Sequence, residues 1–378
     1  MKLLKEILSL PTAPFHESSV AACVIKHSMR LKLPVRSDRA GNLAVRYRRG
    51  RAVQPVIFTA HMDHPGFVVL RASGRTCEVG ILGGINEKFF AGARVVIQTR
   101  GGLVKGRVAK RPLKKKWMGK SVHVVNLQNV AQDFSPANSI SRTKDLRYIL
   151  DEVVHSGDYG WYDLPGFKLK KGIIYTKGAD NLASVASLFD LLYTLKKKRT
   201  PADVTCLFTR AEEVGFIGCI AVAESNAFPK NTPIVVLECS SASAGKVAIG
   251  GGPVLRVGDK LSCFSSEVDC WFRYIADDIS KRDKRFKFQR ALLPGGRCEA
   301  SVWTLAGRKI GGLAFPLGNY HNNGPKKYEP EFVSLADYKW MQQLLLGIAV
   351  AGHANAGLGR EKKLLSDNYK KWKRFLYE

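Results

Sequence analysis

Acidic and histidine side chains stand where several apolar runs of the sequence end. The run "QPVIFTA" is followed by His61 and Asp63. The run "VTCLFTR" is followed by Glu212 and Glu213. Similar positions are held by Asp180 before a long helical pattern, Glu238 after "PIVVL" and His321 after "GLAFPLGNY". In an open α/β sheet the carboxyl ends of the strands form the ligand sites, so the sequence predicts one shared polar site.

Each of these residues alone has an ordinary structural explanation. Asp180 could cap a helix, His61 could be a satisfied core histidine, and Glu238 could belong to an ion pair. Even without Asp63, two imidazoles and four carboxylates are together costly to bury unless cations receive them. The set matches two divalent ions, each taking a histidine, a terminal carboxylate and a share of a bridging carboxylate. Nitrogen and oxygen donors without cysteine suit zinc, cobalt or manganese.

The adjacent pair Glu212 and Glu213 leaves one carboxylate more than the ions need. Neighbouring residues on a turn can point in different directions. One of the two can therefore bind metal while the other acts on the water between the ions. This division into ligand and general base is the chemistry that the spacing predicts.

The surrounding pattern alternates between strands and helices. Residues 41–50 and 54–61 read as two strands with a turn between them. Residues 178–198 place Leu182, Val185 and Phe189 on one helical face and end in a lysine run that suits a helix C-terminus. We therefore expect an α/β fold, a mixed sheet with helices on both faces.

The sequence pattern changes between about residues 70 and 165. Short β-rich pieces such as "CEVGILGG" and "SVHVVNL" are punctuated there by glycine and proline. We expect residues 70–165 to form an inserted small β domain. Residues 1–69 and 166–378 would then form one discontinuous catalytic domain, which fits a chain longer than a usual single core.

Composition restricts the class of protein. The 378 residues are 45% hydrophobic and 24% charged, as in globular proteins, with no run of about 18 apolar residues that would span a membrane. Eight scattered cysteines without a C-x-x-C pair argue against a disulfide framework and against a zinc finger. We expect a cytoplasmic protein with no membrane partner.

The net charge of +28, from 60 Lys and Arg against 32 Asp and Glu, permits binding to nucleic acid or to acidic substrates. These charges are spread along the whole chain, which favours a solvated basic surface. Two basic runs, residues 110–120 and 281–290, are either exposed loops or attractors for acidic peptides. The basic, amphipathic tail from residue 360 predicts a docking helix.

Four motifs carry a resemblance to a known family. "FTAHMDHPGFVV", "KGADNLAS", "TRAEEVGFIG" and "GNYHNNG" are similar, in order and spacing, to motifs of the co-catalytic metallo-aminopeptidases. The resemblance is greatest to the glutamyl/deblocking aminopeptidases that form tetrahedral shells. It extends over most of residues 1–350 and leaves the tail unmatched. It implies peptide substrates, a homo-oligomer, and two divalent metal ions per subunit, zinc or cobalt.

The resemblance also implies a role for each matching residue. Asp180 would bridge both metals, His61 and Glu238 would complete one, and Glu213 and His321 would complete the other. Glu212 would be the general base. Asp63 would orient the His61 imidazole by accepting its other N–H.

The sequence departs from the family at several positions. Asn181 follows the bridging residue where a second Asp is usual, and Glu238 stands where Asp is commoner. Glu299 takes the place of an Asp near the substrate amine, and His64 and Pro65 replace an acidic and an aliphatic residue. No predicted metal ligand is lost, but the preferred substrate is left open.

Two other functions remain open from the sequence. One is an amidohydrolase of the deacylase or carboxypeptidase type, which shares the metal set but usually has its insert between later strands. The other is a basic nucleic-acid-binding protein on a retired peptidase scaffold. Because the sequence contains no recognisable nucleic-acid-binding motif, we expect no nucleic-acid partner.

Overall fold

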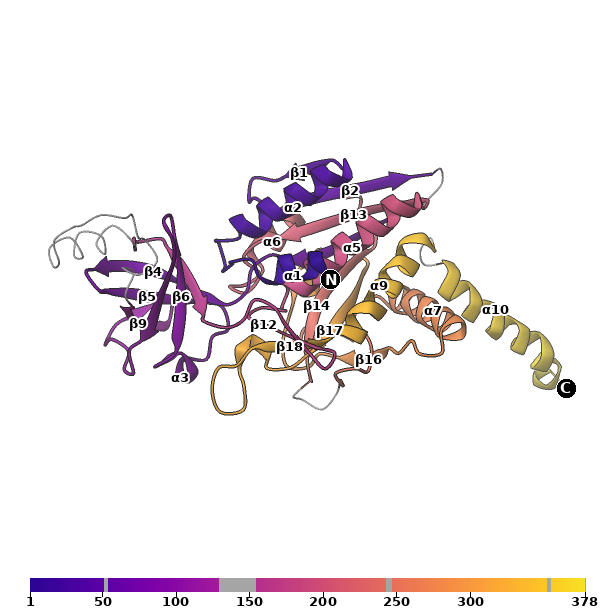
Figure 1. Ribbon diagram of the computed structural model, residues 1–378. Coiled ribbons are helices and arrows are strands. Elements are labelled where there is room, and N and C mark those ends of the chain that lie inside the picture. The colour runs from indigo at the N-terminus through magenta and orange to yellow at the C-terminus, as the bar shows by residue number, and fades with distance from the viewer. Residues whose placement is uncertain (51–53, 129–153, 243–246, 352–354, 378) are drawn as a thin grey trace.

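The computed structural model describes residues 1–50, 54–128, 154–242, 247–351 and 355–377 (Figure 1). Its main sheet has eight strands in the order β1-β2-β13-β3-β14-β17-β15-β16. The strands are β1 Val35–Ser37, β2 Leu43–Arg49, β3 Pro55–His61, β13 Ala202–Thr209, β14 Ile234–Ser241, β15 Val254–Gly258, β16 Gln289–Leu292 and β17 Ile310–Leu317. The central strands β13, β3, β14 and β17 run parallel, whereas β2 and β15 are antiparallel to their central neighbours.

The two strands expected over residues 41–61 are present as β2 and β3, but they do not pair with each other. Strand β13 lies between them, antiparallel to β2 and parallel to β3. The parallel register places Thr209 of β13 opposite His61 of β3. The residues that follow these two strands therefore leave the sheet side by side.

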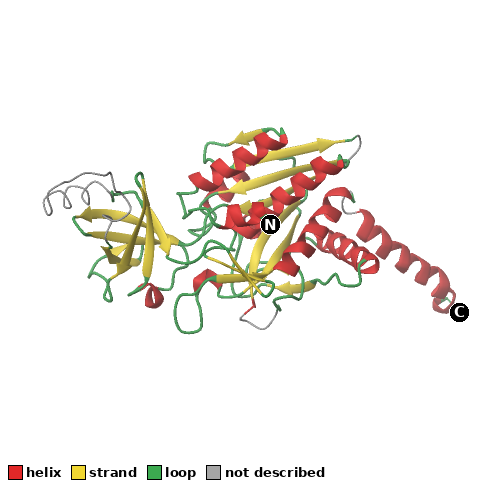
Figure 2. Cartoon of the chain, viewed as in Figure 1, coloured by secondary structure: helices red, strands yellow, loops and turns green. Residues whose placement is uncertain are grey.

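Helices cover both faces of this sheet (Figure 2). One face packs against α1 Lys2–Leu8, α2 Ser18–Leu31, α5 Leu182–Lys198, α7 Ser266–Arg282 and α9 Leu335–Val350. The other face packs against α6 Ile217–Ser225 and α8 Glu299–Leu305. Successive side chains of β3 point to opposite faces of the sheet. Phe58 therefore packs into the core beneath α1, α2, α5, α7 and α9, and Ile57 packs into the core beneath α6 and α8. The predicted fold class is confirmed, and α5 covers the helix expected before the lysine run.

A second sheet closes into a six-stranded barrel beside the main sheet (Figure 1). Its strands are β4 Gly66–Ser73, β5 Thr76–Leu82, β6 Arg94–Thr99, β7 Gly102–Val108, β9 Lys120–Leu127 and β10 Tyr159–Tyr162. Pairing of β5 with β9 closes the ring, and the short β8 Lys116–Trp117 is attached to β9. Phe67, Val79, Val95 and Val125 fill the interior together with Phe90 of the short helix α3 Glu87–Phe90.

A small third sheet supports the entry to α5. It consists of β11 Lys168–Lys170, β12 Ile173–Thr176 and β18 Glu331–Ser334. Strand β12 pairs with β18 so that Thr176 lies opposite Glu331. The 3₁₀ turn η2, Tyr320–Asn322, follows β17. Segments far apart in the sequence thus meet just before Asp180.

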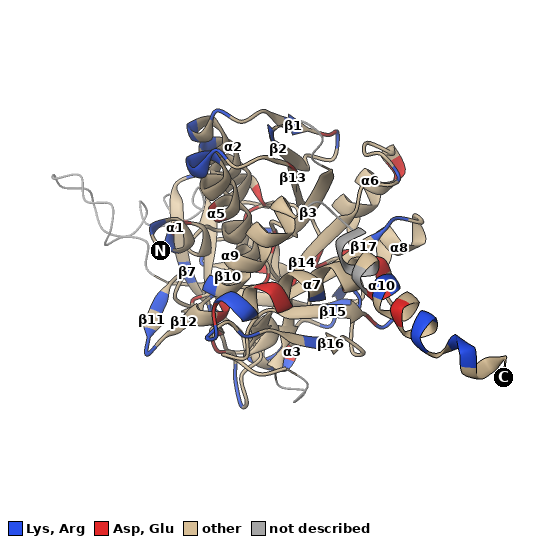
Figure 3. Ribbon diagram, turned by 90° about the vertical axis from the view of Figure 1, so that its right-hand side faces the viewer, with Lys and Arg blue, Asp and Glu red and all other residues tan. Residues whose placement is uncertain are grey.

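The chain ends in the helix α10 Asn355–Trp372 and the 3₁₀ turn η3 Lys373–Leu376, which project from the body (Figure 1). Helix α10 contacts α7. Lys and Arg residues lie on separate elements, including α2, β11 and α10, as expected for dispersed charge (Figure 3). Among the helices that the structure describes, none is long and apolar enough to cross a bilayer.

Candidate metal centre

The predicted site residues meet at the carboxyl ends of the central strands. His61 is the last residue of β3, and Glu238 lies in β14. Glu212 and Glu213 form the turn between β13 and α6. Asp180 immediately precedes α5, and His321 lies in η2 after β17. The parallel register of the sheet therefore brings together residues that are up to 260 positions apart, since 321 − 61 = 260.

His61 lies at the centre of one half of the site. Its Nε2 atom is 3.4 Å from Asp180 Oδ1, 3.8 Å from Glu212 Oε2 and 3.9 Å from Glu238 Oε2. One donor atom from each of His61, Glu212 and Glu238 lies within 4.8 Å of the others. The same holds for His61, Asp180 and Glu213. These spacings suit ligands gathered around a cation.

His321 forms the other half with Glu213. Its Nε2 atom is 3.2 Å from Glu213 Oε2 and 3.9 Å from Asp180 Oδ2. Asp180 thus turns one carboxylate oxygen toward His61 and the other toward His321. A carboxylate presented in this way can bridge two ions.

Several of these donor atoms are buried without a hydrogen-bond partner among the described residues. They are Asp180 Oδ1, Glu213 Oε1, Glu238 Oε1 and His321 Nε2. Buried polar atoms normally have a partner, so four such atoms on the residues of one site are typical of side chains that hold a cation. The residues therefore fit divalent cations, and their nitrogen and oxygen donors suit zinc, cobalt or manganese.

Burial and mutual proximity perturb the protonation of these groups in the metal-free protein. Burial raises the pKa of Glu238 to about 8 and raises the pKa of Glu212 well above its ordinary value. Burial also disfavours the imidazolium of His61, but Glu212, Asp180 and other carboxylates outweigh it and raise the pKa of His61. Without metal, the site therefore retains protons that cations would displace.

Asp63 fixes the turn that carries the two glutamates. Its Oδ1 atom accepts a hydrogen bond from the amide of Glu212, and Oδ2 accepts one from the amide of Glu213, both at 3.0 Å. The His61 Nδ1 atom is 3.4 Å from Asp63 Oδ1 and 3.2 Å from the Asp63 carbonyl oxygen. Asp63 therefore lies against the imidazole, with its main-chain carbonyl as the nearer acceptor, and its carboxylate holds the Glu212–Glu213 backbone.

Glu299 lies beside the site rather than among the grouped donor atoms. It begins α8 and is buried, and its Oε2 atom accepts a hydrogen bond from Thr59 Oγ1 at 2.9 Å. Thr59 belongs to β3, two residues before His61. Burial raises the pKa of the Glu299 carboxyl.

Glu331 is a site residue that sequence reasoning missed. Its Oε2 atom accepts hydrogen bonds from the amides of Ala179 at 2.7 Å and Asp180 at 3.0 Å. Its Oε1 atom accepts one from the amide of His321 at 2.8 Å. One buried carboxylate therefore ties the Asp180 segment to the His321 segment. The available signal was a single acid directly before the apolar pair Phe332 and Val333.

His64, to which the sequence assigned no role, also links two segments of the site. Its Nδ1 atom contacts the carbonyl oxygen of Asp180, and Nε2 lies 3.2 Å from Asn322 Oδ1. Burial lowers the pKa of His64, which favours a neutral ring that carries a single N–H. Because both neighbours are acceptors, the ring donates to one of them, the Asp180 carbonyl at the shorter contact, and only packs against Asn322 Oδ1. The departure from the family pattern at this position thus supplies a ring that joins the segments on either side of the site.

The barrel abuts the site through the glycines that follow β5. A Cβ atom on Gly84 would lie 2.1 Å from His321 Nδ1. A Cβ atom on Gly83 would lie 3.1 Å from the Cβ of Glu213. Only residues without side chains fit here, because the backbone itself packs against two of the candidate ligands.

The comparison with protein families agrees with this geometry. Residues 41–344 match the M42 glutamyl aminopeptidase model. The chain belongs to this family. The match confirms the resemblance seen in the four sequence motifs, and it leaves α1, α2 and α10 of this M42 chain outside the matched range. No curated protein matches the sequence.

Solved structures share the fold of this M42 chain. The Pyrococcus horikoshii TET1 peptidase is 21% identical, with 92% of this chain and 98% of that chain covered and a TM-score of 0.72. The aminopeptidase APDkam598 from Desulfurococcus kamchatkensis is 20% identical, with coverages of 94% and 95% and a TM-score of 0.74. A TET aminopeptidase from a marine-sediment Thaumarchaeota archaeon is 19% identical, with coverages of 95% and 99% and a TM-score of 0.75.

Proposed function

We propose that this protein is a metal-dependent aminopeptidase that removes N-terminal residues from peptides with the help of two divalent cations. The observation that carries the proposal is the position of Asp180, whose two oxygens face His61 and His321 separately. Membership of a peptidase family supports the reaction class. The position of the barrel strands between His61 and Asp180 favours an aminopeptidase over a deacylase or carboxypeptidase.

We assign the residues to the two ions as the family resemblance implies, and the distances in the site are compatible with that assignment. His61 and Glu238 would hold one ion, Glu213 and His321 would hold the other, and Asp180 would be shared. When bound, zinc or cobalt ions would polarise the scissile carbonyl and lower the pKa of the attacking water. We assign no ligand role to Glu299, whose carboxyl could instead face the substrate amine.

Glu212 would act as the general base. Its carboxylate is buried 3.8 Å from His61 Nε2, and Asp63 fixes its backbone. In this position it would accept a proton from the attacking water and deliver a proton to the leaving amine. The carboxylate of Glu213, one residue later, faces His321 instead, so Glu212 remains free to act as the base.

The experiment that tests this function combines elemental analysis with kinetics. Glu212→Gln should lower kcat by about 10²–10⁴-fold while the bound metal is retained. Glu224→Gln changes an exposed glutamate on α6 and serves as the matched control. Full activity in Glu212→Gln would refute the assignment of the base. A panel of free-amine and N-acylated substrates separates aminopeptidase from deacylase activity.

We further propose that the protein works as a homo-oligomer, with residues 70–165 as an inserted domain that takes part in assembly. The support is the fold shared with the TET1 peptidase, whose structure is described as assembling into a tetrahedron or a large octahedral shell. Light scattering of the purified protein would measure the subunit number. A monomer at all accessible concentrations would exclude the proposal.

A further inference from the structure

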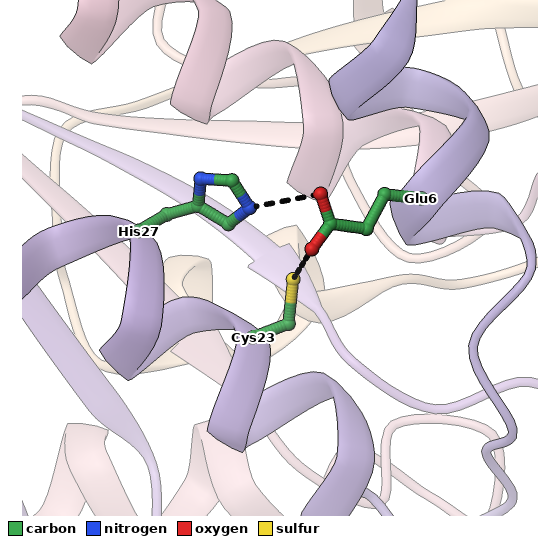
Figure 4. A group of neighbouring side chains, drawn as sticks. All are labelled: Glu6, Cys23 and His27. Atoms are coloured by element: carbon green, nitrogen blue, oxygen red, sulfur yellow. Dashed lines mark hydrogen bonds and ion pairs between the residues drawn. The ribbon is translucent and has the colours of Figure 1, made fainter. Parts of the chain in front are cut away.

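A second group of metal-binding side chains lies at the N-terminus, between α1 and α2 (Figure 4). Cys23 and His27 are four residues apart on α2 and therefore share one face of that helix. Glu6 points toward both of them from α1. One donor atom from each of the three lies within 4.8 Å of the others. The metal centre described above is built from other elements of the fold.

The distances between these side chains approach those of a metal site. His27 Nε2 is 3.4 Å from Glu6 Oε2, and Cys23 Sγ is 3.9 Å from Glu6 Oε1. Around a tetrahedral zinc ion, such donor atoms lie about 3.3–3.6 Å apart, as its bond lengths dictate. The imidazole and carboxylate already have this spacing. The thiol faces the other carboxylate oxygen and lies within 4.8 Å of the remaining donor atoms, so small side-chain rotations would gather all three around one ion.

The orientation of His27 is also that of a ligand. The residue is 3% exposed, and its Nε2 atom has no hydrogen-bond partner in the part of the chain that the structure describes. Its Nδ1 atom lies 2.8 Å from Tyr193 Oη on α5. If Nδ1–H donates to Tyr193, the lone pair of Nε2 points toward Glu6 and Cys23. Metal-binding histidines are commonly oriented in this way by a partner on the other ring nitrogen.

We propose that Glu6, Cys23 and His27 bind one zinc or cobalt ion that links α1 to α2, separately from the catalytic ions. Thiolate, imidazole and carboxylate together suit these two metals. Binding would release the Cys23 proton to solvent and displace Lys26, whose Nζ lies 2.7 Å from Glu6 Oε1. Lys26 is 56% exposed, so its ammonium can move into water, and a water molecule can occupy the fourth position.

The three side chains lie outside the part of the chain that the family model describes. The matched range begins at residue 41, after all three side chains. Tyr193 lies on α5, the helix that follows Asp180, and α1 contacts the same helix. An ion here would therefore brace the N-terminal helices against the helix at the edge of the metal centre.

Cobalt spectroscopy tests the proposal, because only a cysteine ligand gives thiolate-to-cobalt charge-transfer absorption in the near ultraviolet. Among the candidate metal groups of the described residues, this group alone contains a cysteine. The full-length protein would be stripped with a chelator and titrated with Co²⁺. We expect the absorption to reach the intensity of one Co²⁺–thiolate bond per chain, with the catalytic centre taking up further Co²⁺ that adds no such band, and to be lost in Cys23→Ser. Cys263→Ser, at an exposed cysteine, is the matched control and should retain it.

A second variant protects the test against a folding defect. His27→Gln should keep the thiol but weaken Co²⁺ binding at this site by more than about tenfold. Absence of the absorption in the wild-type protein, or its persistence in Cys23→Ser, would overturn the proposal. Peptide hydrolysis would be measured in parallel and is expected to survive in Cys23→Ser. Failure of the proposed peptidase activity would leave the cobalt result unaffected.

Discussion

The carboxylate of Asp63 accepts a 3.0 Å hydrogen bond from the backbone amide of Glu212. A residue that follows β3 therefore sets the position of a residue that follows β13. The neighbouring Ala211 has a φ of 49°, in the left-handed region, so the turn adopts a backbone conformation that needs external support. Glu17 provides further support by accepting a hydrogen bond from the Ala211 amide at 2.9 Å.

We expect Asp63→Asn to lower kcat by about 10–100-fold. The amide group of Asn would turn a donor toward the amide of Glu212 or Glu213, so the turn would shift and misplace both carboxylates. Steady-state kinetics and metal analysis would measure the effect. Asp337→Asn is the control, because Asp337 also accepts two backbone amides, those of Gly250 and Gly252, but outside the site. That control should lower thermal stability and leave kcat close to wild type. Equal kcat losses in the two variants would contradict a specific role for Asp63.

We expect Glu331→Gln to weaken binding of divalent metal by about 10–100-fold. Gln keeps one acceptor oxygen in place of two, so it cannot serve both the Asp180 and the His321 segments. Calorimetric titration of the metal-free protein with Zn²⁺ would give the affinity directly. Glu329→Gln is a control two residues away, in the loop before β18. Wild-type affinity in Glu331→Gln would show that the two segments hold their positions without this carboxylate.

The thermal stability of the metal-free protein should fall as the pH rises from about 6 to 9. The folded-state pKa of Glu238 is raised by burial to about 8, and that of His321 is raised to about 9 because Glu213 and Asp180 outweigh its burial. A raised folded-state pKa means that the native state holds the proton more tightly. Its stabilising effect is complete below the unfolded-state pKa and disappears as the pH passes the folded-state value.

Metal should reverse this trend, since cations bind the deprotonated ligands and stabilise only the folded state. Melting curves in matched buffers, with chelator or with Zn²⁺, would show a metal-induced rise in Tm that grows between pH 6 and 9. Glu238→Gln removes one titrating group and should flatten the decline seen with chelator. A rise in stability with pH in the chelated wild-type protein would contradict the expected sign.

We expect Gly84→Ala to reduce activity by about 10²-fold, the scale of a 1 Å misplacement. The new Cβ would clash with His321, so either the imidazole or the barrel loop must move. The control is Gly101→Ala in the β6–β7 turn, where a Cβ would meet only Thr99 Oγ1, at 3.9 Å, among the described residues. Kinetics of the two variants would be compared directly. Comparable activity in Gly84→Ala and Gly101→Ala would mean that the barrel loop can move away from His321 without disturbing the site.

The strand-end rule explains how much of the site could be predicted from the sequence. His61 ends β3 and Glu213 follows β13, and neighbouring parallel strands bring such positions together. Glu238 reaches the same place from inside β14, which continues to Ser241 beyond the apolar run that the sequence showed. The pattern of α5 was equally clear, since it combines a regular apolar face with a lysine-rich end. Local sequence carries this information because each element is specified by its own residues.

The parts of the site that the sequence did not predict depend on contacts between elements that lie far apart along the chain. Glu331 reaches Asp180 only because β18 pairs with β12, two short strands more than 150 residues apart, since 331 − 176 = 155. Glu6 meets Cys23 only because of the way α1 packs beside α2. The sequence has no C-x-x-C pair, but this does not exclude a metal site at Cys23. Its candidate partners are His27, one helical turn away on α2, and Glu6 on α1.

The pairing of β5 with β9 gives every strand of the six-membered barrel two neighbours. The described barrel strands therefore leave few bare amides and carbonyls to another copy of the chain, which narrows the usual route to open-ended strand-on-strand stacking. Association through this surface would rest mainly on side chains. Such contacts have a defined geometry, and geometry decides whether repeated copies close into a finite particle or grow without limit.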